Sequence, residues 1–353
     1  MTSIDALHIE LVSGDALNDK KFSESWNAFA GELEGFCSDL GWLWATSRGL
    51  KHVPYGLVAK RGDRWVGVLP LSFIRSIYFG KFLVSLPYVN TAGVISSDNE
   101  ATSALVARAV DLADELDVRY LELRHEMPVS HPQLNQQRTD KVHMRLPLPS
   151  SSEELWKGLS PKVRNQVRKG EKQNFEIQWG GLERLDTFYH VFSRNMRDLG
   201  TPVFSPHLFA AILEEYPEQA EFCTLITAGR PIAGALLIHA PGMTQVPSAS
   251  ALREFNSQNP NMLMYWHLLC RAIERGQHTF DFGRSSQQSN TFRFKKQWGA
   301  ESQPAVWQYY DRKGGISEMR PESGKYRLMI KTWQRLPVWL TRRIGPPIVR
   351  GIP

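Results

Sequence analysis

The sequence predicts a mixed α/β protein built from two similar units in tandem. The chain has 353 residues, about twice the usual length of one domain. A strand hairpin, a further strand, a helix and another strand follow one another in this order in both halves. Between the halves, a proline- and serine-rich segment at residues 146–152 interrupts every periodic pattern. A duplicated α/β unit is the simplest arrangement that explains these observations.

The first half opens with a helical pattern and continues with strands. Apolar residues recur at helical spacing over residues 22–40, which predicts one or two helices. A hairpin is predicted over residues 55–71, with its turn at residues 61–64, and a further strand over 81–86. A helix over 102–116 and a strand over 119–124 complete this half.

The second half begins with helices and then repeats the same order. Ser151 and Glu154 form a capping box, and Pro161 is suited to the first position of a helix over 162–173. Helical spacing recurs over residues 182–196 and 208–213. The repeated elements are predicted as a hairpin over 221–239, a strand over 244–251, a helix over 262–275 and a strand over 278–283.

The segment after that helix, residues 276–300, combines several features expected of a small-molecule site. In the predicted strand, Phe280 and Phe282 lie on one face and Asp281 on the other. A polar loop is predicted over residues 284–290. Residues 292–296 then alternate aromatic and basic side chains, as is typical of an extended segment.

Two runs in this segment, FDFGRS at residues 280–285 and TFRFKKQWGA at 291–300, resemble the C-terminal signature of the FemABX superfamily. The resemblance is closest to the FemAB-related branch associated with exosortase and exopolysaccharide loci, and it extends more weakly from about Trp42 onward. It implies two GNAT-like acyltransferase domains that transfer acyl or aminoacyl groups to amines. We expect these domains at residues 1–148 and 149–312, followed by a basic amphipathic arm at 313–353.

Lys295 is the first candidate for chemistry. Attack of an amine on an ester or thioester forms an oxyanion that an ammonium group stabilises, and loss of such a donor costs about 3 kcal/mol. In the family pattern this role belongs to a Phe-Lys pair, which matches Phe294 and Lys295. Phe294 would hold the lysine stem. In an extended segment, Arg293 would share the face of Lys295 and bind a phosphate of the donor.

Two further residues are candidates for proton transfer. Asp281 either orients the acceptor amine and receives its proton, or pairs with Arg284 or Arg293 and positions them; an ordinary pKa near ~4 makes it a weak base. Tyr265 lies in an apolar helix and is either a core residue or a general acid of the GNAT type. Arg284, Ser285 and Ser286 are suited to binding a sugar or peptide acceptor, or to solvent.

The helix over residues 162–173 carries a basic stripe. Arg164, Arg168 and Lys172 lie one turn apart and repel one another, so the stripe is either a binding face for an anion such as phosphate or carboxylate, or a solvated basic face. The resemblance implies that this helix lines the donor or acceptor cleft. The positions that match the family pattern are Lys162, Arg164, Arg168 and Lys169.

The donor is predicted from what the sequence lacks. Residues 252–261, which precede the long helix, contain no glycine, whereas a glycine-rich turn cradles the pyrophosphate of acyl-CoA in GNAT domains. This favours aminoacyl-tRNA or an acyl carrier and leaves acyl-CoA second. No tightly bound cofactor and no metal are predicted.

Composition sets the cellular expectations. A net charge of +6 is too small to choose among an acidic substrate, RNA and an anionic membrane. Cys37, Cys223 and Cys270 form no CxxC pair, so buried thiols in a reducing cytoplasm are expected, and no secretory signal is recognised at the N-terminus. The arm combines Trp with Arg and Lys, which predicts either contact with the inner face of the cytoplasmic membrane or packing on its own domain.

The sequence therefore predicts an acyl- or aminoacyltransferase that modifies an amine of a cell-envelope or exopolysaccharide precursor. The acceptor would be a peptide, a small molecule, or a lipid- or nucleotide-linked sugar. Two alternatives remain open. One is an acyl-CoA- or acyl-carrier-dependent GNAT N-acetyltransferase acting on an amino sugar, and the other is a non-catalytic scaffold that binds RNA or membrane.

Overall fold

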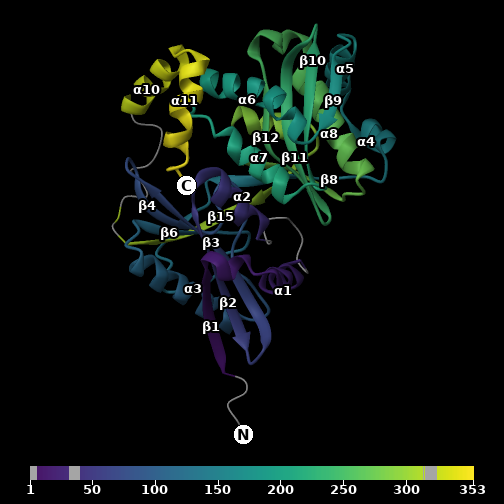
Figure 1. Cartoon of the computed structure of the whole chain (residues 1–353). Coiled ribbons are helices and arrows are strands. Elements are labelled where there is room, and N and C mark those ends of the chain that lie inside the picture. Colours follow the sequence, from purple (N-terminus) through teal and green to yellow (C-terminus); the bar gives the residue numbers. More distant parts are fainter. Residues whose placement is uncertain (1–5, 32–39, 313, 315–323) are drawn as a thin grey trace. The chain divides into compact units, whose positions relative to one another are not determined.

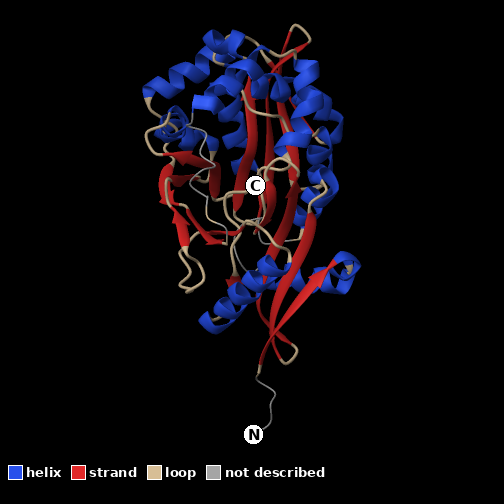
Figure 2. Cartoon of the chain, turned by 90° about the vertical axis from the view of Figure 1, so that its left-hand side faces the viewer, coloured by secondary structure: helices blue, strands red, loops and turns tan. Residues whose placement is uncertain are grey.

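A computed structural model describes residues 6–31, 40–312, 314 and 324–353. Two mixed β-sheets, each with helices packed against it, organise this part of the chain (Figures 1 and 2). The chain divides into two compact units around these sheets. The predicted mixed α/β class is confirmed.

The first unit contains the sheet with the strand order β1-β2-β3-β4-β6-β15-β7, and β5 pairs with β3. Its strands are β1 (Leu7–Ser13), β2 (Val53–Arg61), β3 (Arg64–Ser76), β4 (Gly80–Val84), β5 (Ile95–Ser96), β6 (Tyr120–His125), β7 (Gln136–Arg138) and β15 (Val306–Asp311). Its helices are η1 (Gly14–Asn18), α1 (Lys20–Ala30), α2 (Gly41–Leu50) and α3 (Asn99–Glu115). The predicted hairpin is β2–β3. The helical pattern over residues 22–40 is α1 as far as Ala30, and residues 32–39, which include Cys37, lie outside the described residues.

The second unit contains the sheet with the strand order β14-β8-β13-β12-β11-β10-β9. Its strands are β8 (Lys141–Pro147), β9 (Glu176–Gly180), β10 (Ala220–Thr227), β11 (Arg230–Ala240), β12 (Met243–Ala251), β13 (Thr279–Ser286) and β14 (Glu301–Pro304). Its helices are α4 (Ser152–Gly158), α5 (Pro161–Glu171), η3 (Leu182–Arg184), α6 (Leu185–Leu199), α7 (Pro206–Glu215), η4 (Arg253–Gln258), α8 (Pro260–Glu274), α9 (Asn290–Lys296), α10 (Gly324–Arg335) and α11 (Val338–Val349).

The units differ from the domains expected at 1–148, 149–312 and 313–353. The division falls at Lys141, because β8 pairs between β13 and β14 in the second sheet. The strand β15 returns to the first sheet, between β6 and β7. The C-terminal arm is not a separate body: α10 and α11 contact α6 and belong to the second unit, while residues 350–353 belong to the first.

The C-terminal helices pack directly on α6. A Cβ on Gly200, at the C-terminal end of α6, would lie 2.4 Å from Cγ2 of Ile330 in α10. The end of α6 and helix α10 therefore approach each other closely at this glycine. The amide of Gln334 donates to the carbonyl oxygen of Asp198 at 3.0 Å. The chain breaks between α10 and α11 at Leu336 and Pro337, whereas α11 continues through Pro346 and Pro347.

Each unit contains a parallel strand pair whose two strands flank its long helix. In the first unit β4 and β6 are parallel, and the described ladder ends at Val84 and Glu122. In the second unit β12 and β13 are parallel, and the ladder ends at Gln245 and Asp281. Glu122 and Asp281 therefore occupy equivalent positions in the two sheets, as the repeated order of segments predicts.

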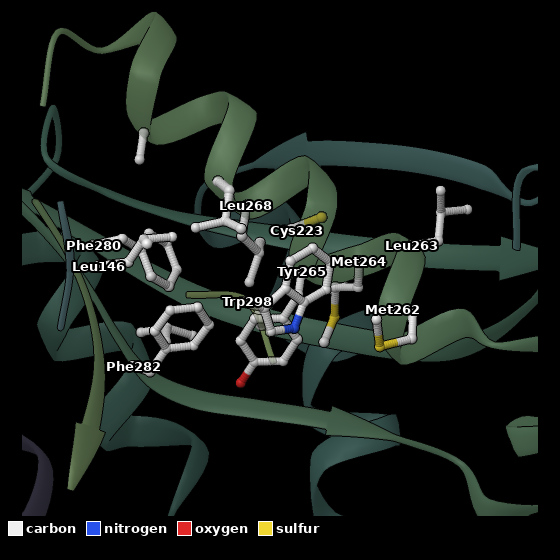
Figure 3. Close-up of a cluster of buried hydrophobic side chains, with 14 of the residues drawn as sticks. Leu146, Cys223, Met262, Leu263, Met264, Tyr265, Leu268, Phe280, Phe282 and Trp298 are labelled. Atoms are coloured by element: carbon white, nitrogen blue, oxygen red, sulfur yellow. The ribbon is translucent and has the colours of Figure 1, made fainter. Parts of the chain in front are cut away.

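The core of the second unit lies on the face of its sheet that α4, α5 and α8 cover. Figure 3 shows Tyr265, Phe282 and Trp298 close together in this cluster. Residues that point into it from β8 and β13 are Val142, Met144, Leu146, Phe280 and Phe282. Because side chains alternate along a strand, His143, Arg145 and Asp281 lie on the opposite face.

A buried polar network on β10 and β11 is structural. His239 is almost fully buried and contacts Thr244 Oγ1 at 2.8 Å and Glu221 Oε1 at 3.0 Å. Burial alone would raise the pKa of Glu221, but hydrogen bonds from His239 and Arg271 and the charges of Arg271 and Arg275 lower it to about 2. His239 is thus a buried core histidine whose two ring nitrogens both have hydrogen-bond partners.

Among the described residues, no helix combines the length and the apolar character that crossing a bilayer requires.

Candidate functional site

Lys295 lies on a short helix, α9, and not on the extended segment that alternation predicted. Ser289 caps this helix, and its Oγ accepts from the backbone N–H of Phe292 at 3.1 Å. Phe294 packs edge-on against Tyr265, with 4.9 Å between the ring centroids. Because residues two apart point in different directions on a helix, the expectation that Arg293 shares the face of Lys295 is wrong. Arg293 is exposed, whereas Lys295 is buried.

The ammonium group of Lys295 is bound to the end of β13. Its Nζ donates to the carbonyl oxygens of Gly283 at 3.1 Å and Arg284 at 3.0 Å. The φ angle of Gly283 is 77°, a left-handed conformation that glycine adopts without strain. Burial lowers the pKa of Lys295 to about 8, opposed by the charge of Asp281 and assisted by that of Arg284. An ammonium group has three N–H donors, so these carbonyls leave one for a ligand.

Asp281 is held from two sides. Its side chain is 1% exposed, and Oδ1 accepts from the backbone N–H of Gly283 at 2.6 Å. Its Oδ2 lies 3.7 Å from Nε of Arg145, which comes from β8. Sequence reasoning offered Arg284 or Arg293 as the arginine partner and missed Arg145. The structure thus gives Asp281 the contacts of a positioning carboxylate.

A second residue of β8, His143, lies near the charged side chains of Arg145, Arg284 and Lys295. It is fully buried, and its pKa is lowered to about 3 by burial and by the charges of Arg145, Arg284 and Lys295. His143 is therefore neutral at physiological pH. Sequence reasoning missed both β8 residues, although the alternation of apolar residues with His143 and Arg145 was a signal for them.

The polar residues predicted as a loop from Arg284 are partly strand. The strand β13 continues to Ser286, so only residues 287–289 connect it to α9. Ser285 is 4% exposed, and its hydroxyl oxygen has no hydrogen-bond partner in the part of the chain that the structure describes. Such a group is suited to bind a polar ligand. Ser286 is half-buried.

Tyr265 belongs to the core. Its ring stacks on Phe282 with 5.6 Å between centroids and contacts Phe294 of α9. Burial raises the pKa of its hydroxyl. These contacts favour the packing role that the sequence left open, in which Tyr265 supports α9 against β13.

The predicted basic helix is α5, which begins at Pro161 after its cap Ser160. Its residues Lys162, Arg168 and Lys169 are exposed and Arg164 is half-buried. The guanidinium of Arg168 lies 5.4 Å from the centroid of the Trp156 ring. The helix packs on α8, on the core face of the sheet, whereas the charged cluster around Lys295 lies at the end of β13.

The segment before α8 has no glycine-rich turn. Residues Arg253–Gln258 form the helix η4, Asn259 has a left-handed backbone with φ of 58°, and Pro260 opens α8 without a backbone N–H. Gly170 of α5 approaches here, since a Cβ on it would lie 3.1 Å from the carbonyl oxygen of Asn259. These residues do not form the backbone cradle that captures pyrophosphate.

Comparisons with known proteins agree with this fold. Residues 160–296 match the family described as acetyltransferase (GNAT) domain. A crystal structure of FemX is similar, with a TM-score of 0.63 at 15% identity over 82% of this chain and 96% of that one. The structure of L-PGS from Bacillus licheniformis has a TM-score of 0.53 at 12% identity, covering 93% of this chain and 97% of that one. A tandem GNAT protein of the clavulanic acid pathway has a TM-score of 0.51 at 13% identity, covering 85% and 98%.

No curated protein matches the chain by sequence. The tandem GNAT-like fold predicted from the sequence is confirmed, and the exopolysaccharide branch stays a prediction.

Proposed function

We propose that the chain is an acyl- or aminoacyltransferase whose reaction takes place in the second unit, at the end of β13. The observation that carries this proposal is the buried ammonium group of Lys295, bound to two carbonyl oxygens next to Asp281. A cation that is held in place and largely shielded from solvent can stabilise an oxyanion.

The strands β12 and β13 offer a place for an extended donor. Their described ladder ends at Gln245 and Asp281, although β12 continues to Ala251 and β13 to Ser286. The facing strand edges beyond this point are suited to a chain that carries amide groups, as in recognition by β-strand addition. A pantetheine arm has two amide groups of this kind, and an aminoacyl ester offers an ester carbonyl and an amino group.

The first unit fills the equivalent place with its own chain. The backbone N–H of Ser85 donates to the carbonyl oxygen of Glu122 at 2.9 Å, and that of Ala92 to Arg124 at 2.8 Å. The Glu122 carboxylate forms an ion pair of 2.6 Å with Arg124, and both side chains are buried. This difference favours the second unit as the one that binds substrate.

The reaction that we propose is direct attack of an acceptor amine on the donor carbonyl. The new C–N bond forms as the C–O or C–S bond to the carrier breaks, and the proton of the amine leaves with the alcohol or thiol. Lys295 would donate to the oxyanion through its third N–H. Asp281, fixed by Gly283 and Arg145, would orient the amine, and neutral His143 would add no competing charge.

Aminoacyl-tRNA or an acyl carrier is the donor that we favour, because the segment before α8 lacks a pyrophosphate cradle. The exposed basic residues of α5 support a polyanionic donor. The resemblance to the FemABX superfamily supports an amine of a cell-envelope component as the acceptor, and the similarity in fold to a FemX structure agrees with this proposal. The match to an acetyltransferase domain supports the second candidate, acyl-CoA-dependent N-acyl transfer to an amino sugar.

We expect the protein to act in the cytoplasm, where Cys223 and Cys270 would stay reduced; both are free thiols, the first buried and the second half-buried.

The test uses hydroxylamine as a general amine acceptor, with charged tRNA and acetyl-CoA as alternative donors. We expect turnover with one donor and a loss of about 10²- to 10³-fold in Lys295→Met. Lys296→Met is the matched control, because Lys296 is exposed and lies over the ring of Phe292. Unchanged turnover in Lys295→Met would contradict the proposal. Binding of tRNA without turnover by any donor would favour the scaffold alternative.

A further inference from the structure

A cavity of about 510 Å³ lies between α6 and α11 in the second unit. These helices are in contact, and the yellow α11 lies beside α6 in Figure 1. The residues that line the cavity, four of which are basic, are His190, Arg194, Arg197, Val338, Trp339 and Arg342. The proposed transfer reaction uses none of them.

Arg342 is fixed in this cavity by neutral groups. Its Nε donates to Ser193 Oγ at 2.8 Å and its Nη2 to the carbonyl oxygen of Tyr189 at 3.4 Å. Its guanidinium also lies 5.2 Å from the centroid of the Tyr189 ring. The pKa of His190 is lowered, first by burial and then by the surrounding arginines, as expected for a positive environment. Because neutral acceptors hold Arg342 in place, its positive charge remains available to an anion.

The acidic residues nearby do not neutralise the cavity. Arg194 pairs with Glu254 at 3.0 Å, and Arg197 pairs with Asp198 at 2.6 Å. Glu254 is shared, because Arg230 pairs with it as well. Within the part of the chain that the structure describes, the ion pairs of the three lining arginines and Arg230 involve two carboxylates, so an excess of positive charge remains.

Helix α11 and helix α10, which also contacts α6, expose large apolar side chains and basic ones. Trp339, at the cavity, is 67% exposed, and Leu328 and Met329 of α10 are 69% and 64% exposed. Lys331 and Arg335 of α10 are also exposed. Exposed tryptophan and aliphatic residues among cations are typical of a surface that meets a membrane interface.

We propose that this cavity binds the phosphate group of an anionic phospholipid, with Trp339 inserted among the headgroups. Guanidinium groups match phosphate oxygens in charge and geometry. A soluble phosphate compound would meet the same arginines, but it would leave Trp339, which lines the cavity, in water. A phospholipid would pair its phosphate with the arginines and would also remove the exposed Trp339 side chain from water. This site is independent of the proposed transfer reaction.

The experiment measures co-sedimentation of the full chain with phosphatidylcholine vesicles and with vesicles that also contain phosphatidylglycerol. The variants are Arg342→Gln and Trp339→Ser. Arg343→Gln is the matched control, because Arg343 is exposed on the same helix, has the same charge and does not line the cavity. Urea unfolding of each variant checks the fold, and Trp339→Ser removes only an exposed side chain. Titration with inorganic phosphate, followed by phosphorus NMR, tests the soluble source.

We expect binding to the anionic vesicles only. Arg343→Gln should weaken it by about 5-fold at most, the general contribution of one basic residue, and Arg342→Gln and Trp339→Ser each by about 10-fold or more. Equal losses in Arg342→Gln and Arg343→Gln would overturn the proposal, as would equal binding to both vesicle types or none. Binding of inorganic phosphate through Arg342 without vesicle binding would assign the cavity to a soluble phosphate compound and also overturn it.

Discussion

Replacing Lys295 by Met should remove a pH dependence of stability that comes from the buried ammonium group. Burial lowers the pKa of this lysine from 10.5 to about 8. At about 1.4 kcal/mol per pKa unit, the protonated form is disfavoured in the folded chain by about 3 kcal/mol. Between these two pH values, the unfolded chain binds a proton that the folded chain has released. Stability conferred by this residue therefore rises as the pH increases from about 8 to 10.5.

The assay is urea unfolding followed by tryptophan fluorescence, at intervals from about pH 7 to pH 10.5, for the native chain and two variants. The free energy of unfolding of the native chain, relative to Lys295→Met, should increase by about 3 kcal/mol over this range. Lys296→Met, which removes an exposed neighbour on α9, should show the same pH dependence as the native chain.

Two results would refute the reasoning. One is a constant difference between the native chain and Lys295→Met across the range. The other is a loss of the pH dependence of the unfolding free energy in Lys296→Met that equals the loss in Lys295→Met. A consequence for activity can be checked with the same proteins: since the oxyanion needs the ammonium form, the transfer rate should fall above about pH 8 in the native chain.

Three further predictions concern the framework around the site. Ser289→Ala removes the cap of α9 and should cost about 1 kcal/mol in urea unfolding; no change would show that the cap is unimportant. Gly170→Ala should cost about 1–3 kcal/mol, because a Cβ would lie 2.8 Å from that of Leu263. Gly158→Ala is its control: nothing lies within 4 Å of that Cβ, so this change should be neutral or stabilise by up to about 1 kcal/mol. Glu221→Gln should lose about 3 kcal/mol near neutral pH, because the Glu221 pKa is lowered from 4.5 to about 2. In the native chain this stability is present above pH 4.5 and lost as the pH falls to about 2, and thermal unfolding of the variant should show no such loss.

The order of strands and helices could be predicted from periodicity, but the local form of the site could not. Alternation of aromatic and basic residues fits a strand, yet the Ser289 cap and the packing of Phe294 on Tyr265 make this segment a helix. The arginine partner of Asp281 depends on a pairing between β8 and β13 that joins distant parts of the chain. No local pattern specifies that register, so Arg145 could not be assigned to Asp281 from sequence alone.

The strand β8 belongs to the sheet of the second unit, but the later strand β15 belongs to the sheet of the first unit. Most of the second unit is therefore inserted in the sequence between two parts of the first unit. During synthesis, β6 is complete long before its neighbour β15, which is separated from it by the second unit's sheet and its helices up to α9. Until β15 joins, the backbone groups of β6 that face it have no ladder partner, and such an open edge invites pairing with other chains. Expressing residues 1–148 separately would leave this edge of β6 without β15 permanently.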